Sequence, residues 1–122
     1  MRSIALLRES DTTWLGLDIV GLAQLGLPDL EAIFAEGKED PEAVELLLRN
    51  VALHLTAGRP IAPGSTSDDG SGRKWEASHS LAVVAPRRPV VRWLPSGSPR
   101  PSEAVMTRLA ELSAGPGTPE QK

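Results

Sequence analysis

One segment, residues 41–57, constrains the fold most, because its local signals agree on a helix. Asp40 is a favourable N-cap, Pro41 fits the first helical position, and Gly58 fits the position just past a helix end. Apolar side chains recur on one face at helical spacing, and these are Val44, Leu47, Leu48, Val51 and Leu55. We expect this face to pack against a sheet.

The same helix carries a second apolar stripe on its far side. The stripe consists of Leu46, Leu53 and Ala57. A helix that is apolar on two sides needs cover on both. We therefore expect the second stripe to be covered either by a C-terminal helix or by another subunit.

Short apolar runs with alternating or β-branched residues predict the strands of the sheet. The expected strands are residues 3–7, 12–20, 29–35, 74–85 and 90–94, and the last two form a hairpin. Residues 21–26 fit either a short helix or a bulged strand. We expect a polar loop at residues 59–73 and a short helix at residues 102–113. The predicted fold class is α+β, with a mostly antiparallel sheet of about five strands packed against the main helix and the C-terminal helix packed beside that helix.

Length and composition limit the organisation and location of the chain. Its 122 residues suit a single domain, which we place at 1–114, and residues 115–122 are expected to be a disordered tail. The absence of cysteine excludes disulfides, thiolate metal sites and a cysteine nucleophile. The apolar run after Met1 is too short for a signal peptide, and no stretch reaches the roughly 18 apolar residues of a membrane span. We expect a cytoplasmic protein without membrane contact, and the excess of arginine over lysine suggests a GC-rich bacterial gene.

The net charge of −3 is unevenly distributed along the chain. Residues 1–72 carry an acidic excess, whereas residues 73–108 carry a basic excess. Either the two parts pair across the folded domain, or the basic part forms a face for an anionic partner. The acidic side chains of Asp18, Glu31, Glu36 and Asp40 could supply carboxylates for general acid–base chemistry, but the sequence does not fix the distances between them, and we expect them to face solvent.

No catalytic constellation or metal site is recognisable in the sequence. His54 and His79 lack the partner spacing of metal ligands, and we interpret both as structural. Ser78 and Ser80 flank His79, but alternate strand positions point to opposite faces, so neither serine can act with it as a nucleophile–base pair. The sequence predicts no catalytic residue, no metal and no cofactor, and it favours a protein without enzymatic activity.

One polar segment is a candidate for binding a small molecule. Residues 64–74 contain several glycines and end in a lysine, but Trp75 follows where a phosphate-binding loop needs serine or threonine. A flexible loop before a strand is the simpler interpretation. The residues that a ligand site here would use are Asp68, Asp69, Arg73, Lys74, Trp75 and His79.

Basic residues around Trp93 offer a second candidate surface. Arg87, Arg88, Arg92 and Arg100 interleaved with an aromatic ring suit contact with a nucleic acid. Arg92 and Trp93 nevertheless occupy opposite faces of one strand, and a pI of 5.4 argues against a dedicated nucleic-acid binder. Arg87 and Arg88 are more simply the solvated tip of a hairpin. The candidates for a protein interface are Leu46, Leu53, Ala57, Arg87 and Arg88.

Several short motifs occur in an order that resembles a known family. They are the segments Gly21–Glu31, Leu48–Leu55, Pro63–Thr66, Trp75–His79 and Arg88–Leu94. Over about residues 14–94 this order resembles the C-terminal part of an uncharacterised bacterial family, domain of unknown function 4261. The resemblance implies a domain without an established activity, and it supplies no catalytic residues.

Three functions remain open. The leading hypothesis is a non-enzymatic protein-interaction module, an accessory or immunity-type protein that binds a protein partner or a second copy of itself, because the main helix has a second apolar stripe. The second hypothesis is a small-molecule-binding protein or enzyme that uses residues 64–79. The third is weak nucleic-acid binding through Arg87 to Arg100.

Overall fold

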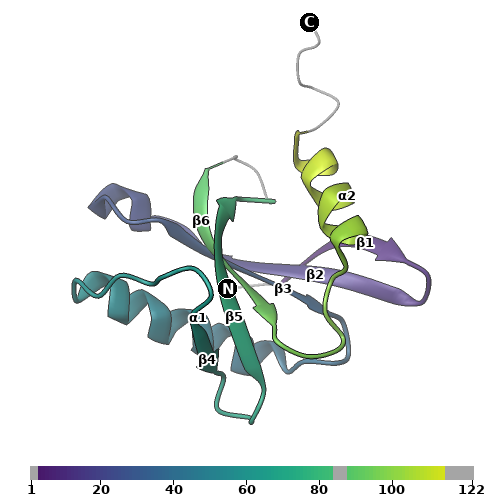
Figure 1. Cartoon of the computed structure of the whole chain (residues 1–122), viewed down its shortest axis with the longest axis horizontal. Helices are drawn as coiled ribbons and strands as arrows, with labels where there is room; N and C mark the ends of the chain where they lie inside the picture. The colour runs from purple at the N-terminus through teal and green to yellow at the C-terminus, as the bar shows by residue number, and fades with distance from the viewer. Residues whose placement is uncertain (1–2, 84–87, 115–122) are drawn as a thin grey trace, which may run out of the picture.

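The computed structural model describes residues 3–83 and 88–114. Within these residues the chain forms one six-stranded sheet, two α-helices and a short 3-10 helix (Figure 1). The strands are β1 (Ile4–Glu9), β2 (Thr12–Ile19), β3 (Asp29–Ala35), β4 (Thr66–Asp68), β5 (Lys74–Leu81) and β6 (Pro89–Pro95). The helices are η1 (Leu22–Leu25), α1 (Pro41–Thr56) and α2 (Glu103–Ala114). The predicted α+β class is confirmed.

Helix α1 forms where its capping residues predict. Asp40 Oδ1 accepts a hydrogen bond from Glu42 N at 3.0 Å, and Pro41 occupies the first helical position. After the last turn Gly58 has a φ of 83°, a left-handed conformation that only a residue without Cβ adopts easily. The predicted apolar face is buried, namely Val44, Leu47, Leu48, Val51 and Leu55.

The strand order is β1-β2-β3-β6-β5-β4. Neighbouring strands run antiparallel except β3 and β6, which are parallel at the centre of the sheet. The sheet is thus mostly antiparallel, as predicted, but β4 is an additional strand within the segment expected to be a polar loop. It forms because Thr66, Ser67 and Asp68 pair with the neighbouring strand β5.

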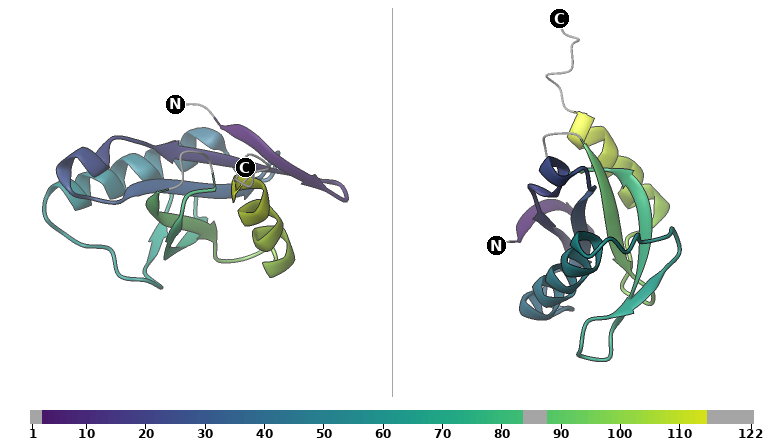
Figure 2. Two further views of the ribbon diagram at one scale, coloured as in Figure 1. Left: turned by 90° about the horizontal axis from the view of Figure 1, so that it is seen from above. Right: turned by 90° about the vertical axis from the view of Figure 1, so that its left-hand side faces the viewer.

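Both faces of the sheet are apolar, and each α-helix covers one of them (Figure 2). Helix α1 packs on a cluster that includes Phe34 and Trp75. Helix α2 packs on the opposite face, where Val105 joins Trp14 and Ile33. The expectation that the C-terminal helix lies beside α1 is therefore wrong. Alternate residues of β2 and β3 make the second face apolar at this end, so this face needs its own cover.

Two other segments refine the prediction. Residues 21–26, which fitted a helix or a bulged strand, contain the helix η1. Strand β5 ends at Leu81 rather than at residue 85, and Val83 contributes to the cluster beneath α2 instead of continuing the α1 face.

Ion pairs connect the acidic first part of the chain to its basic last part. Arg92 Nε donates to Glu31 Oε2 at 2.7 Å, between β6 and β3. Arg88 pairs with both Asp18 and Asp29. Glu31 has 0% of its surface exposed, so the expectation that it faces solvent is wrong. These contacts confirm that the two oppositely charged parts of the chain pair with each other.

Candidate functional site

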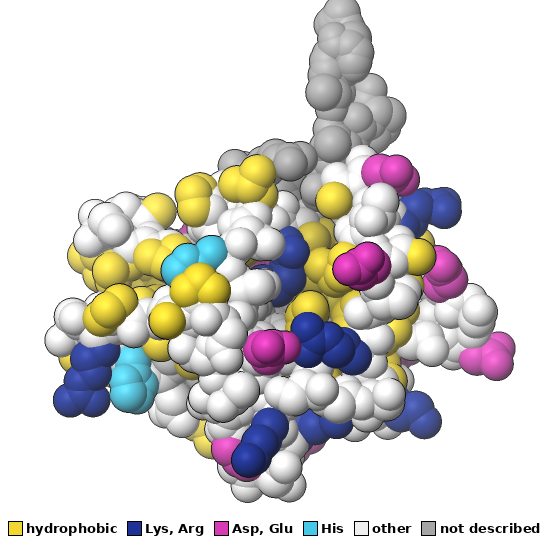
Figure 3. Space-filling view, viewed as in Figure 1, with side chains coloured by type: hydrophobic (Ala, Val, Ile, Leu, Met, Phe, Trp, Pro, Cys, Tyr) yellow, Lys and Arg dark blue, Asp and Glu magenta, His cyan; other side chains and the backbone are white. Residues whose placement is uncertain are grey.

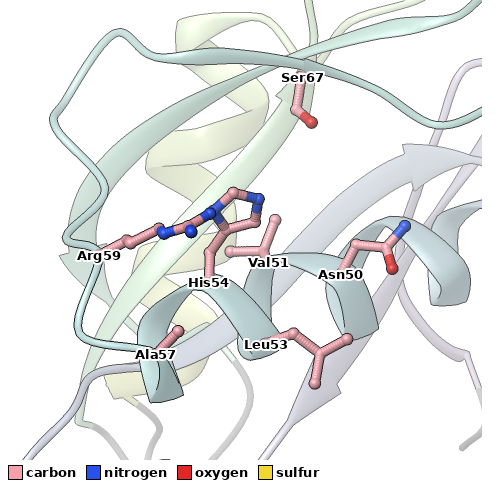
Figure 4. A pocket seen from close by; sticks show the side chains of 7 residues that line it. All are labelled: Asn50, Val51, Leu53, His54, Ala57, Arg59 and Ser67. Carbon is pink, nitrogen blue, oxygen red and sulfur yellow. The ribbon is translucent and has the colours of Figure 1, made fainter.

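A groove lies between α1 and the edge strand β4 (Figure 4). Its volume is about 430 Å³, and its lining side chains are Asn50, Val51, Leu53, His54, Ala57, Arg59 and Ser67. Val51 points from α1 into the space below β4, and Ser67 points from β4 toward α1 (Figure 4). The groove is lined by one face of α1, by Arg59 of the loop that follows it and by Ser67 of β4.

The charge of this groove is positive. Arg59 extends from the loop after α1 and lies beside the ring of His54 (Figure 4). The described residues that line the groove include no Asp or Glu. An arginine with a neighbouring histidine can bind a carboxylate through charge-assisted hydrogen bonds. The groove is thus suited to an acidic group on a largely apolar ligand.

The outer face of α1 is exposed next to this groove. Leu46 is 52% exposed and Leu53 is 66% exposed. Ala57, the third residue of the predicted stripe, is exposed as well. None of them can be covered by α2, which packs on the other side of the sheet. We call Leu46, Leu53 and Ala57 the outer stripe.

A second, more apolar cavity of about 380 Å³ lies beneath the end of α1. Leu27, Leu55, Ile61 and Val91 contribute apolar walls, and His79 lies at its rim. His79 Nε2 is 2.7 Å from Ile61 O, so that nitrogen carries the proton and donates to the carbonyl. Hydrophobic side chains gather on this side of the molecule, over η1 and the end of α1 (Figure 3).

Asp69, one of the predicted ligand residues, holds the turn between β4 and β5. It is 4% exposed. Its Oδ1 accepts hydrogen bonds from Ser71 N at 2.9 Å and Ser71 Oγ at 2.6 Å, and its Oδ2 accepts one from Trp75 Nε1 at 3.0 Å. Burial alone would raise the pKa of Asp69, but the hydrogen bonds from Ser71 and then Trp75 lower it below its ordinary value. The carboxylate is therefore charged and already bonded within the protein.

The remaining predicted ligand residues do not converge on one point. Arg73 pairs with Glu39 at 2.9 Å and so ties the turn to the segment before α1. Asp68 Oδ1 accepts a hydrogen bond from a backbone N–H of its own turn. Lys74 is exposed, and His79 lies further along β5 at the apolar cavity. The structure brings Asp69 and Trp75 together and leaves the other candidates apart.

Arg88 is not a free surface residue. Burial alone would lower its pKa, but its hydrogen bonds with Asp29 and Asp18 raise the pKa above its ordinary value, and the guanidinium stays charged. The prediction that it lies at a solvated hairpin tip is wrong. Arg87, the other basic interface candidate, lies outside the described residues.

The other basic residues considered for nucleic-acid contact also have internal partners. Arg92 is buried against Glu31, on the face of β6 opposite to Trp93. Arg100 pairs with Glu76 at 3.1 Å. A phosphate backbone would have to compete with these carboxylates.

Sequence reasoning missed most of the groove between α1 and β4. Arg59 follows the helix in a segment read as polar loop, and Ser67 belongs to a strand without an apolar signal. His54 was interpreted as structural, but its side chain is exposed in the groove. One usable signal was the spacing of Asn50, His54 and Ala57, which places them on one face of a helix.

Residues 3–83 and 88–114 contain neither a metal-binding cluster nor a membrane-spanning helix. No group of three or more His, Asp or Glu side chains in this part of the chain could hold a metal ion. Neither α-helix is long and apolar enough to cross a membrane.

Comparison with known protein families identifies the family of the chain. The model of one protein family matches residues 18–94, which is more than half of the chain. This range contains the groove, the apolar cavity and the buried ion pairs. No curated protein matches the chain, and no solved structure matches it. The chain belongs to the family described as Domain of unknown function (DUF4261).

Proposed function

We propose that this protein is a non-enzymatic protein-interaction module, an accessory or immunity-type protein that acts by binding another protein. The observation that carries the proposal is the outer stripe of α1. Leu46 and Leu53 lie two turns apart on one helix face and are 52% and 66% exposed. Large apolar side chains that repeat along one exposed helix face are typical of a surface that a partner covers.

The buried charged side chains support the same proposal, because they already have partners within the protein. Asp69, Glu31 and Arg92 are buried and hydrogen-bonded to other parts of the protein. A carboxylate held in this way stabilises the fold and is not oriented toward a substrate. Near Leu53 and Ala57 of the stripe, Arg59 and His54 are exposed polar groups that a partner can contact.

The test is affinity capture of partners from the source organism with three forms of the protein. The double variant Leu46→Asp/Leu53→Asp should lose a partner that the wild type retains. The control is Leu25→Asp in η1, because Leu25 is 65% exposed, almost the same as Leu53. A partner that is retained by the double variant as well as by the control would refute a role for the stripe.

A homodimer would cover the same stripe, and light scattering after size-exclusion chromatography separates that case. A wild-type dimer that becomes a monomer in the double variant identifies a second copy as the partner. A monomer in both forms leaves the stripe to a different protein.

A second candidate function is the binding of a small molecule in the apolar cavity. Its support is the cavity of about 380 Å³ with apolar walls and with His79 and Arg59 at its rim, which suits a small apolar carboxylate. Thermal unfolding in the presence of a series of aliphatic and aromatic carboxylates tests it. A rise in melting temperature that disappears when Ile61→Trp fills the cavity would support this function, and no rise across the series would exclude it for this class of ligand.

A further inference from the structure

Strand β4 leaves one row of backbone groups without a strand beside it. It is the last strand in the sheet order, so it pairs only with β5. Ser65 O accepts from Ala77 N at 2.8 Å, and Asp69 N donates to Arg73 O at 3.1 Å. Because backbone groups of alternate residues point in opposite directions in an antiparallel pair, residues 65, 67 and 69 face β5. The N–H and C=O groups of Thr66 and Asp68 therefore point toward the free edge.

The free edge borders the groove beneath α1. Ser67 pairs with Trp75, whose ring lies in the cluster on the α1 face, so the side chain of Ser67 also faces α1. An extended segment that pairs with β4 would alternate its own side chains in the same way, and every second one would enter the groove. Val51 and Ala57 give these side chains an apolar surface.

The charge of the groove selects among extended segments. Arg59 and His54 lie together in the groove, and no acidic side chain is among its described lining residues (Figure 4). A carboxylate on the incoming segment would form charge-assisted hydrogen bonds with Arg59. The same geometry repels a segment with lysine or arginine at that position.

We propose that β4 and the adjoining groove bind an extended segment of a partner protein by strand addition, with apolar side chains in the groove and a carboxylate on Arg59. The carboxylate can be that of an Asp or Glu side chain or of a chain terminus. This inference rests on the proposed function, because it names how a protein partner is recognised. It differs from the outer stripe in using main-chain pairing, which reads backbone shape and tolerates many sequences.

Two libraries of random ten-residue peptides test the proposal directly, one with blocked ends and one with free C-termini. We expect the wild type to enrich peptides that carry apolar residues at alternate positions and one acidic group. Enrichment of Asp or Glu in the blocked library identifies a side-chain carboxylate, and enrichment in the free-ended library alone identifies a terminal one. Absence of enrichment in both libraries would overturn the proposal.

Substitutions in β4 and the groove give the matched controls. Thr66→Pro removes an N–H that faces the free edge, whereas Thr66→Val keeps it. Proline is tolerated at this position because Thr66 is the first residue of an edge strand. Binding of an enriched peptide should weaken about tenfold in Thr66→Pro, since about 1.4 kcal/mol is lost with such a hydrogen bond, and should change little in Thr66→Val. Arg59→Glu should reverse the charge preference from acidic to basic peptides. Equal binding by the two Thr66 variants, or an unchanged preference in Arg59→Glu, would refute strand addition here.

Failure of this inference can be distinguished from failure of the proposed function. A partner that is lost in Leu46→Asp/Leu53→Asp but kept in Thr66→Pro supports an interaction module and contradicts strand addition at β4. Dimerisation that is lost in Thr66→Pro and kept in Thr66→Val shows that a second copy occupies the edge, which also overturns the peptide proposal.

Discussion

The buried pair Glu31–Arg92 allows a quantitative test of how the centre of the sheet is stabilised. Glu31 on β3 and Arg92 on β6 are direct neighbours in the parallel register. Glu31 accepts hydrogen bonds from Arg92 Nε at 2.7 Å and from Val83 N at 2.8 Å. Replacing Arg92 by methionine keeps an unbranched side chain but leaves a carboxylate that is 0% exposed with one remaining donor.

The expected cost follows from that loss. Removing one partner of a buried ion pair destabilises a protein by about 3–5 kcal/mol, because the other charge stays buried without compensation. The same cost applies to Glu31→Leu, which leaves the guanidinium of Arg92 without its carboxylate partner. The double variant removes both charges, and it leaves the N–H of Val83 without its acceptor and the carbonyl of Leu81 without its donor from Arg92. Because Leu81 is half exposed and water can reach its carbonyl, the cost of the double variant should fall to about 1–3 kcal/mol. For a domain with a total stability of about 5–15 kcal/mol, each single substitution is a large perturbation.

Urea unfolding at neutral pH provides the assay, with the tryptophan fluorescence as the signal. The double-mutant cycle should show that the two substitutions together cost several kcal/mol less than the sum of the single costs. If the cost of the double variant equals that sum, or if Arg92→Met alone costs less than about 1 kcal/mol, the Glu31–Arg92 pair does not stabilise the contact between β3 and β6.

Three further predictions concern other parts of the structure. Asp69→Asn should cost about 1–2 kcal/mol at neutral pH. Because the folded state lowers the pKa of Asp69, this difference in stability is fully present above the ordinary pKa of 3.8 and is lost as the pH falls through the lowered pKa. The urea midpoints of the two forms should therefore converge in acid, and a constant gap between them would contradict this linkage. Leu46→Ser and Leu53→Ser should each change the free energy of unfolding by less than about 0.5 kcal/mol, because these side chains are exposed, and a cost above 2 kcal/mol in thermal melts would mean that they are structural. Gly16→Ala places a Cβ 2.8 Å from Leu6 Cδ1 and should cost about 1–2 kcal/mol, which Leu6→Val should partly restore; no recovery in the double variant would exclude this clash as the cause.

The elements that the sequence predicted well are those with strong local signals. Asp40, Pro41 and Gly58 mark α1 through capping rules that depend only on nearby residues. Strand β3 was placed correctly over Asp29–Ala35 because it alternates and is bounded by Pro28. The α+β class followed from these elements.

The features that the sequence did not predict depend on contacts between distant residues. Strand β4 has three polar residues and is defined by pairing with β5 rather than by a hydrophobic pattern. Glu31 looked like a solvent-facing charge because its partner Arg92 is 61 positions away. The groove combines α1, a loop residue and β4, so Arg59 and Ser67 could not be placed together from spacing along the chain.

The parallel pairing of β3 with β6 has a consequence for how the chain folds. The strands β1, β2 and β3 are consecutive in sequence, as are β4, β5 and β6, so each half can form from local contacts. Joining the halves closes a long loop, and the entropy of that closure must be overcome before the central contacts stabilise the product. Until then β3, all of whose residues are buried in the final structure, is an uncovered edge. We therefore expect the yield of refolding to fall steeply with protein concentration, because two half-folded chains can pair through β3 before either one closes its own sheet.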